Sequence, residues 1–210
     1  MMDLLFMCIL FLLSLSLALT HCWQQYTDLA PVSNEHDNLK LEQLSGSINR
    51  CIWIGLKRNS SDREKWLWSG GGAATMFFWA PGKPNNCHSV EDSGCVWINR
   101  WNDANPQNIN TFFCYRAIVV EEEQTWEEAL DYCREHHDDL ASVASETEML
   151  ELPKHNTTEH IWIGLRFLSR DWLWMDRQVM DYEAWGEGEN PGVLFWATHD
   201  CEKRPSFICY

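Results

Sequence analysis

The pattern of apolar and polar positions contains one four-residue stretch twice, Trp53-Ile54-Gly55-Leu56 and Trp162-Ile163-Gly164-Leu165. A short run of large apolar residues around a glycine is typical of a buried strand that another backbone approaches closely. Four identical residues in two distant places indicate a duplication, and an internal repeat decides the fold before any other signal does. The sequence therefore predicts one core strand in each of two copies.

Helical periodicity precedes the second of these stretches. Thr125 and Glu128 form a capping box, in which a hydroxyl lies three residues before a glutamate at the start of a helix. Apolar positions then recur on one helix face, and they are Trp126, Ala129, Leu130 and Cys133. We expect a helix here and a strand over residues 117–120. A second capping box begins at Ser145, and residues 33–44 are its counterpart in the first copy.

Other landmarks recur in the same order in both copies. Each copy has a cysteine followed by Asp-Leu-Ala, then the core strand, a Trp-Leu-Trp stretch and a further Trp with a Pro after it. The cysteines that open and close the copies are Cys22, Cys114, Cys133 and Cys209. Helices followed by strands predict an α+β fold for each copy. We place the two domains at residues 21–115 and 116–210.

The N-terminal segment is apolar from Leu4 to Leu19, which is too short for a comfortable membrane span. It is typical of a signal peptide over residues 1–20, with cleavage near Ala18. An uncleaved anchor is the alternative, because no positive charge precedes the apolar run. Cleavage would remove Cys8 and leave the first domain without its opening strand and the first two turns of its helix. Since no later stretch could span a bilayer, we expect a secreted, extracellular product.

Composition agrees with that expectation. The chain has 210 residues, a net charge of −15 and nine cysteines. A chain this acidic repels phosphate backbones, so nucleic acid is excluded as a partner, and the cysteine count favours an oxidising compartment. Asn59 and Asn156 stand in N-glycosylation motifs. No catalytic motif and no acid/base pair at a defined spacing is present, so we expect no enzyme.

The order of these landmarks, with Trp101-Asn102-Asp103 in the first copy, resembles the C-type lectin-like domain in tandem. The resemblance covers nearly all of residues 22–210. It implies an α+β fold with two helices, small antiparallel sheets and a long loop beside the core strand. Against that pattern the first domain is truncated at its N-terminus. The second has a shortened long loop between Trp185 and Cys209.

The resemblance also implies disulfides. A bridge from the first helix to the last strand would join Cys22 to Cys114 and Cys133 to Cys209. The family's second bridge has no complete pair of positions here, which leaves Cys51, Cys87, Cys95 and Cys201 over. Cys87 and Cys95 could close a small loop, and Cys201 could bridge two chains. Unpaired thiols are the equal alternative.

Sugar-binding members of the family use a Ca²⁺ ion that also accepts two sugar hydroxyls, and such an ion needs six to eight oxygen ligands. In the first domain the resemblance assigns both carbohydrate and metal binding to Asn85, Glu91, Asn102 and Asp103. Lys83 opposes the metal, because the family has Glu or Gln there and an ammonium donates but cannot accept. Calcium is therefore a candidate cofactor of the first domain only, and its involvement is open.

The second domain departs further from the pattern. Trp196-Ala197-Thr198 stands where Trp-Asn-Asp is expected, and Asn190 and Gly192 flank the loop proline. We expect no calcium there. The sequence predicts an extracellular, carbohydrate-binding lectin whose partners are glycans or glycoproteins. The alternative is a protein-binding or scaffold module on the same fold, with a protein receptor as its partner.

Overall fold

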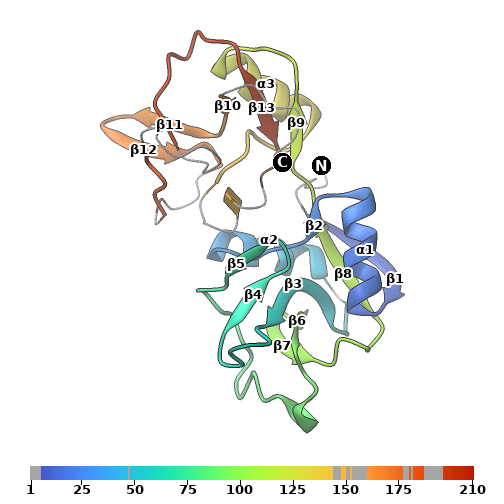
Figure 1. The fold of residues 1–210 in the computed structure, drawn as a ribbon. Coiled ribbons are helices and arrows are strands. Elements are labelled where there is room, and N and C mark those ends of the chain that lie inside the picture. Colours follow the sequence, from blue (N-terminus) through green and yellow to red (C-terminus); the bar gives the residue numbers. More distant parts are fainter. Residues whose placement is uncertain are drawn as a thin grey trace. The chain divides into compact units, whose positions relative to one another are not determined.

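The computed structural model describes residues 6–46, 48–143, 148–149, 152, 160–176, 180, 182–186 and 196–210, with side chains from residue 12 onward. These residues fall into two compact units, one ending at Arg116 and the other beginning at Ala117 (Figure 1). We call them domain 1 and domain 2. Within the described part of the chain, no helix is long and apolar enough to cross a membrane.

Domain 1 contains one branched sheet and two α-helices among its described residues. Its main path runs β1-β8-β3-β4-β5, with β2 added to β8, β6 to β3, and β7 to β6. The elements are β1 (Phe6–Leu13), α1 (Leu15–Gln25), β2 (Asp28–Leu29), α2 (Glu35–Ser45), β3 (Ile52–Arg58), β4 (Trp66–Trp68), β5 (Gly71–Ala73), η1 (Cys87–Ser89), β6 (Ser93–Trp97), β7 (Arg100–Ala104) and β8 (Asn110–Tyr115).

Domain 2 contains a three-stranded sheet in the order β10-β13-β9, a hairpin of β11 and β12, and a helix. The elements are β9 (Ile118–Val120), α3 (Trp126–His136), β10 (Ile161–Trp162), β11 (Leu165–Leu168), β12 (Asp171–Trp174) and β13 (Ser206–Cys209). The capping box predicted at α3 is present. Most of the helix predicted after Ser145 lies outside the described residues, as do Asn156 and the loop over residues 187–195.

The repeated stretch lies within β3 in domain 1, as predicted, whereas in domain 2 its Trp162 ends β10 and its Leu165 begins β11. In both domains it runs parallel to the last strand, with Trp53 opposite Phe112 and Trp162 opposite Phe207. The sequence predicted antiparallel sheets, so each main sheet differs by one parallel pair. A parallel pair needs a long crossover between its two strands. The many residues between the core strand and the last strand supply that crossover.

The glycine of the repeated stretch lies against the Asp-Leu-Ala segment. Gly55 N–H donates to the carbonyl of Ala30 at 2.9 Å, and Gly164 N–H donates to the carbonyl of Ala141 at 2.8 Å. A Cβ atom at Gly164 would lie 2.6 Å from the carbonyl oxygen of Leu140, and one at Gly55 would meet backbone oxygen at 2.9 Å. Only glycine fits without displacing backbone, which explains why both copies carry it.

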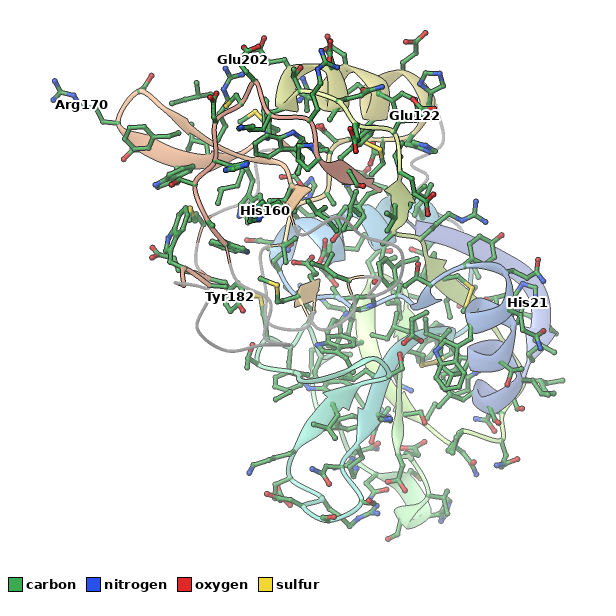
Figure 2. All side chains as sticks on the ribbon, turned by 45° about the horizontal axis from the view of Figure 1, so that its top comes forward. His21, Glu122, His160, Arg170, Tyr182 and Glu202 are labelled. Carbon is green, nitrogen blue, oxygen red and sulfur yellow. A yellow bond between two sulfur atoms is a disulfide. The ribbon has the colours of Figure 1, made fainter. Side chains whose placement is uncertain are left out.

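The two long disulfides are confirmed. Cys22 pairs with Cys114 and Cys133 with Cys209 (yellow bonds in Figure 2). Beside the first of them, the ring of His21 in α1 packs edge-on against Phe112 of β8, with ring centroids 5.5 Å apart.

The remaining cysteines of domain 1 pair differently from the predicted alternatives. Cys95 is bonded to Cys51, with their Cα atoms 5.5 Å apart, so a Cys87–Cys95 bridge is wrong. The reason is that β6 pairs with β3, which brings Cys95 beside the residue that precedes β3. Cys87 and Cys201 are free thiols on exposed positions.

Domain 1 also has the opening strand and full helix that the sequence predicted to be missing. Strand β1 pairs with β8, and α1 repeats the buried stripe of α3 with Leu15, Ala18, Leu19 and Cys22. The indole of Trp53 donates to the carbonyl of Leu13, just as Trp162 donates to Gln124. The uncleaved chain therefore contains both elements, and a truncated domain 1 stays a prediction that depends on signal-peptide cleavage. The apolar segment that resembles a signal peptide has the pattern of β9 and α3, and its cleavage stays a prediction.

Two substitutions in α1 test whether this segment is part of the folded domain. Ala18 is fully buried, whereas Leu17 is 57% exposed. Ala18→Asp should lower the free energy of unfolding by about 3 kcal/mol, because it buries an unpaired carboxylate. Leu17→Asp should change it by less than ~0.5 kcal/mol. Urea unfolding of the refolded full-length chain checks this, and equal effects of the two variants would contradict it.

The close approach at Gly55 gives a second prediction. Gly55→Ala should destabilise domain 1 by about 1–3 kcal/mol, because the added methyl group overlaps the carbonyl of Leu29. Ser60→Ala, at an exposed turn after β3, is the control and should be neutral. Urea unfolding followed by tryptophan fluorescence measures the difference. A Gly55→Ala chain as stable as the parent would show that the backbone can separate at no cost.

Candidate functional site

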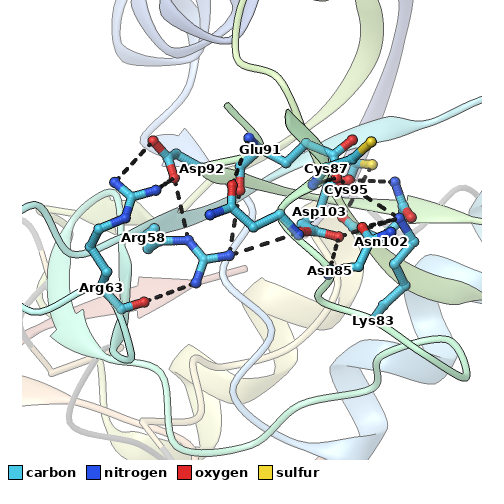
Figure 3. Close-up of polar contacts among 11 residues, drawn as sticks. Arg58, Arg63, Lys83, Asn85, Cys87, Glu91, Asp92, Cys95, Asn102 and Asp103 are labelled. Carbon is cyan, nitrogen blue, oxygen red and sulfur yellow. Dashed lines mark hydrogen bonds and ion pairs between the residues drawn. The ribbon is translucent and has the colours of Figure 1, made fainter. Parts of the chain in front are cut away.

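The candidate site residues of domain 1 lie on two segments that the sheet brings together (Figure 3). Lys83-Pro84-Asn85 belongs to the loop after β5, and its Lys83–Pro84 peptide bond is cis. Glu91 follows η1 on the same loop. Asp103 belongs to β7, where it pairs with Gly94 of β6. The fold therefore places Asn85, Glu91 and Asp103 around the side chain of Lys83.

Asp103 is the centre of this arrangement. Its side chain is fully buried, and its two carboxylate oxygens accept the backbone N–H groups of Asn85 at 3.2 Å and Asn86 at 2.5 Å. It also forms ion pairs with Lys83 at 3.4 Å and with Arg58 at 3.8 Å. A buried carboxylate is tolerated only with such compensation. Asp103 therefore fixes the loop backbone to the sheet.

Lys83 brings a positive charge to the point where the side-chain oxygens converge. Its Nζ atom donates to Oδ1 of Asn85 at 2.8 Å and lies 4.0 Å from Oε2 of Glu91. With its ion pair to Asp103, it contacts oxygens from three separate places in the sequence. The Lys83 side chain is 22% exposed and that of Glu91 is 19% exposed, so both are partly shielded from water.

Glu91 and Asn102 have further partners. Oε2 of Glu91 accepts the backbone N–H of Cys87 at 2.8 Å, and its own N–H donates to Oδ1 of Asn86 at 3.1 Å. Asn102 is tied to the main chain of its strand, because its Nδ2 donates to the carbonyl of Asp103 at 2.6 Å. The same Nδ2 lies 3.9 Å from Sγ of Cys51, beside the Cys51–Cys95 bridge.

The sequence-based prediction of the site missed Arg58. Its guanidinium lies 4.4 Å over the ring of Trp66, 3.3 Å from the carboxylate of Asp92 and 3.8 Å from that of Asp103. A signal was available in the repeat, since the core strand of domain 2 carries Phe167 where domain 1 carries Arg58. A cation that only one copy has, at the end of a shared strand, points to a role specific to that copy.

The donor set does not fit a calcium ion. Calcium needs six to eight oxygens at about 2.3–2.6 Å. Here a nitrogen that carries protons already lies among those oxygens and holds Asn85 Oδ1 at 2.8 Å. Two cations at one point repel strongly. Among the described residues, no three His, Cys, Asp or Glu side chains converge on a metal position. Calcium binding stays a prediction of the sequence that this geometry does not favour.

Among the described residues of domain 2, the equivalent position has no such arrangement. An isolated backbone bridge joins Trp79 to Trp101 in domain 1, and another joins Trp185 to Trp196 in domain 2. This equivalence places Ala197 and Thr198 where domain 1 has Asn102 and Asp103, and both are exposed. Neither can supply the buried carboxylate. The loop residues Asn190 and Gly192 lie outside the described part of the chain.

The role of Asp103 gives a prediction. Asp103→Asn should destabilise domain 1 by about 2–4 kcal/mol, because it removes the buried carboxylate that Lys83 and Arg58 both face and leaves them only the more exposed Glu91 and Asp92. Asp62→Asn breaks the exposed pair with Lys65 and should cost less than ~1 kcal/mol. Urea unfolding measures both, and hydrogen exchange at Asn85 and Asn86 reports the loosened loop. Similar costs for the two variants would contradict the central role of Asp103.

Comparison with known proteins shows which sequences this chain is similar to. The chain is 24% identical over 213 residues to "C-type mannose receptor 2" of Homo sapiens, an alignment that covers 78% of this chain and 14% of that protein. It is 32% identical over 108 residues to "Dromaiocalcin-1" of Dromaius novaehollandiae, covering 41% of this chain and 76% of that protein. The chain thus spans about one seventh of the length of the mannose receptor.

A solved structure is also similar to this chain. The carbohydrate-recognition domain of the mouse scavenger receptor C-type lectin aligns with a TM-score of 0.49 and 23% identity, over 53% of this chain and 89% of that one. The sequence profile of the Lectin C-type domain matches residues 12–116 and again residues 122–210. The two matches cover most of the chain, so it belongs to the C-type lectin domain family and carries two copies of that domain.

Proposed function

We propose that the chain is an extracellular carbohydrate-recognition protein that binds glycans through the loop of domain 1. The observation that carries this proposal is the mixed set of donors and acceptors around Lys83. A sugar hydroxyl both donates and accepts, so a pair of neighbouring hydroxyls needs both kinds of partner in one place. The Lys83 ammonium and the exposed amide of Asn85 can donate, and the carboxylate of Glu91 can accept.

The family and its named relatives support a binding role. Relatives described as mannose receptors and as lectins share the domain. Partners of this chain are accordingly proposed to be glycans or glycoproteins, bound without chemical conversion. Asn85, Glu91, Asn102 and Asp103 remain the proposed carbohydrate-binding residues, with Asn85 as the most exposed contact and Asp103 as the buried support.

Disulfides support an extracellular location. The structure has three disulfides among its described residues, and such bonds persist in oxidising compartments. Asn59 lies directly after β3, where its Oδ1 accepts the backbone N–H of Ser61. We propose that it is glycosylated together with Asn156 after secretion.

A glycan array of the full-length chain tests the proposed function. We expect binding to at least one glycan class, and Asn85→Ala should weaken it about tenfold or more through the loss of one or two hydrogen bonds. Asn108→Ala, an exposed amide in the turn before β8, is the matched control and should bind like the parent. A chain that binds no glycan, or an Asn85→Ala chain that binds as well as the parent, would contradict the proposal and favour protein recognition.

A further inference from the structure

The side chain of Lys83 places its positively charged ammonium at the point where the site oxygens of domain 1 converge. We propose that its ammonium is a resident cation, which orders the loop in place of a metal ion. Domain 1 then holds its site in one conformation at any calcium concentration, and chelators have no effect on it. This inference does not depend on which ligand the loop binds.

The geometry is that of a small cation site. The Nζ atom contacts Asn85 at 2.8 Å, Asp103 at 3.4 Å and Glu91 at 4.0 Å. These residues come from the start of the loop, its end and the strand β7. One ammonium therefore links three segments. A bound metal ion that takes ligands from several segments would have the same structural role. A lysine ammonium is a compact point charge with three donors, so it is suited to such a position.

The charges around the loop balance without any added ion. Three carboxylates and three cationic side chains face one another here through the ion pairs of Figure 3. They are Glu91, Asp92, Asp103, Arg58, Arg63 and Lys83. A divalent ion would leave the cluster with a net charge of about +2, whereas removal of Lys83 would leave it negative around a buried carboxylate. The balance therefore depends on Lys83.

A consequence for recognition rests on the proposed function. A metal ion bound to the protein takes sugar hydroxyl oxygens directly as ligands, whereas an ammonium can only donate hydrogen bonds to them. Glycan binding by domain 1 would then be insensitive to EDTA. Sugar hydroxyls would accept from Lys83 and Asn85 and donate to Glu91.

The test removes the cation and asks whether the stability of the loop depends on it, with and without calcium. The melting temperature and the hydrogen exchange of the loop amides are measured for the full-length chain in EDTA and in ~10 mM CaCl₂. The parent should be identical in both. Lys83→Met keeps the aliphatic stem but loses the charge, so it should melt ~4 °C or more below the parent in EDTA. Calcium should not restore that loss, because the remaining oxygens of Asn85, Glu91 and Asp103 are too few for a calcium ion.

Lys65→Met is the matched control, since Lys65 forms only an exposed pair with Asp62, and it should respond to neither condition. Lys83→Arg keeps the charge and should remain insensitive to calcium, which separates loss of charge from a general folding defect. A parent that melts higher in calcium overturns the inference. So does a Lys83→Met chain that is as stable as the parent.

These readouts involve no glycan, so the two proposals can fail separately. If the array shows no binding but Lys83→Met lowers the melting temperature and loosens the loop, the resident cation stands and the proposed function falls. If the parent binds glycans only when calcium is present, the proposed function stands and the resident cation falls.

Discussion

Each domain depends on one close approach of two backbones, between the glycine of the core strand and the Asp-Leu-Ala segment. Gly55 donates to Ala30, and Ala30 in turn donates to Phe113 of the last strand. Gly164, Ala141 and Ile208 repeat the same chain of hydrogen bonds in domain 2. This contact joins the core strand to the last strand through the Asp-Leu-Ala segment, and the long disulfide joins the helix to that last strand.

The site of domain 1 is built on the far side of the same core strand. Strand β3 pairs with β6, and β6 pairs with β7, so Asp103 is carried into the interior beside the end of β3, where Arg58 lies. The buried carboxylate then accepts hydrogen bonds from the loop backbone and forms an ion pair with the Lys83 ammonium. Domain 2 keeps the core strand but has Phe167 and Thr198 at the corresponding places. Among the described residues, domain 1 alone has the charges that hold the loop in this way.

Much of the fold could be predicted from the sequence because its signals are local and occur twice. The stripe of Trp126, Ala129 and Cys133 specifies a helix by its spacing alone, and α3 has it. The same stripe in α1 was overlooked because its residues lie within an apolar segment that is also typical of a signal peptide. An overall apolar composition masked the helical period there, although Ser14 and Ala18 occupy the same positions in α1 as Thr125 and Ala129 in α3.

The sequence by itself determined the duplication, the α+β class, the two long disulfides and the loop that carries the candidate residues. The duplication and the α+β class follow from periodicity and from recurrence along the chain, whereas the disulfides and the loop follow from what the resemblance to a known family implies. Only the tertiary structure decided that Cys95 pairs with Cys51 and that the Lys83 ammonium lies among the oxygens of Asn85, Glu91 and Asp103. The physical reason is that both depend on which strands become neighbours. Strand pairing between distant segments places one side chain against another, and no local pattern records that choice.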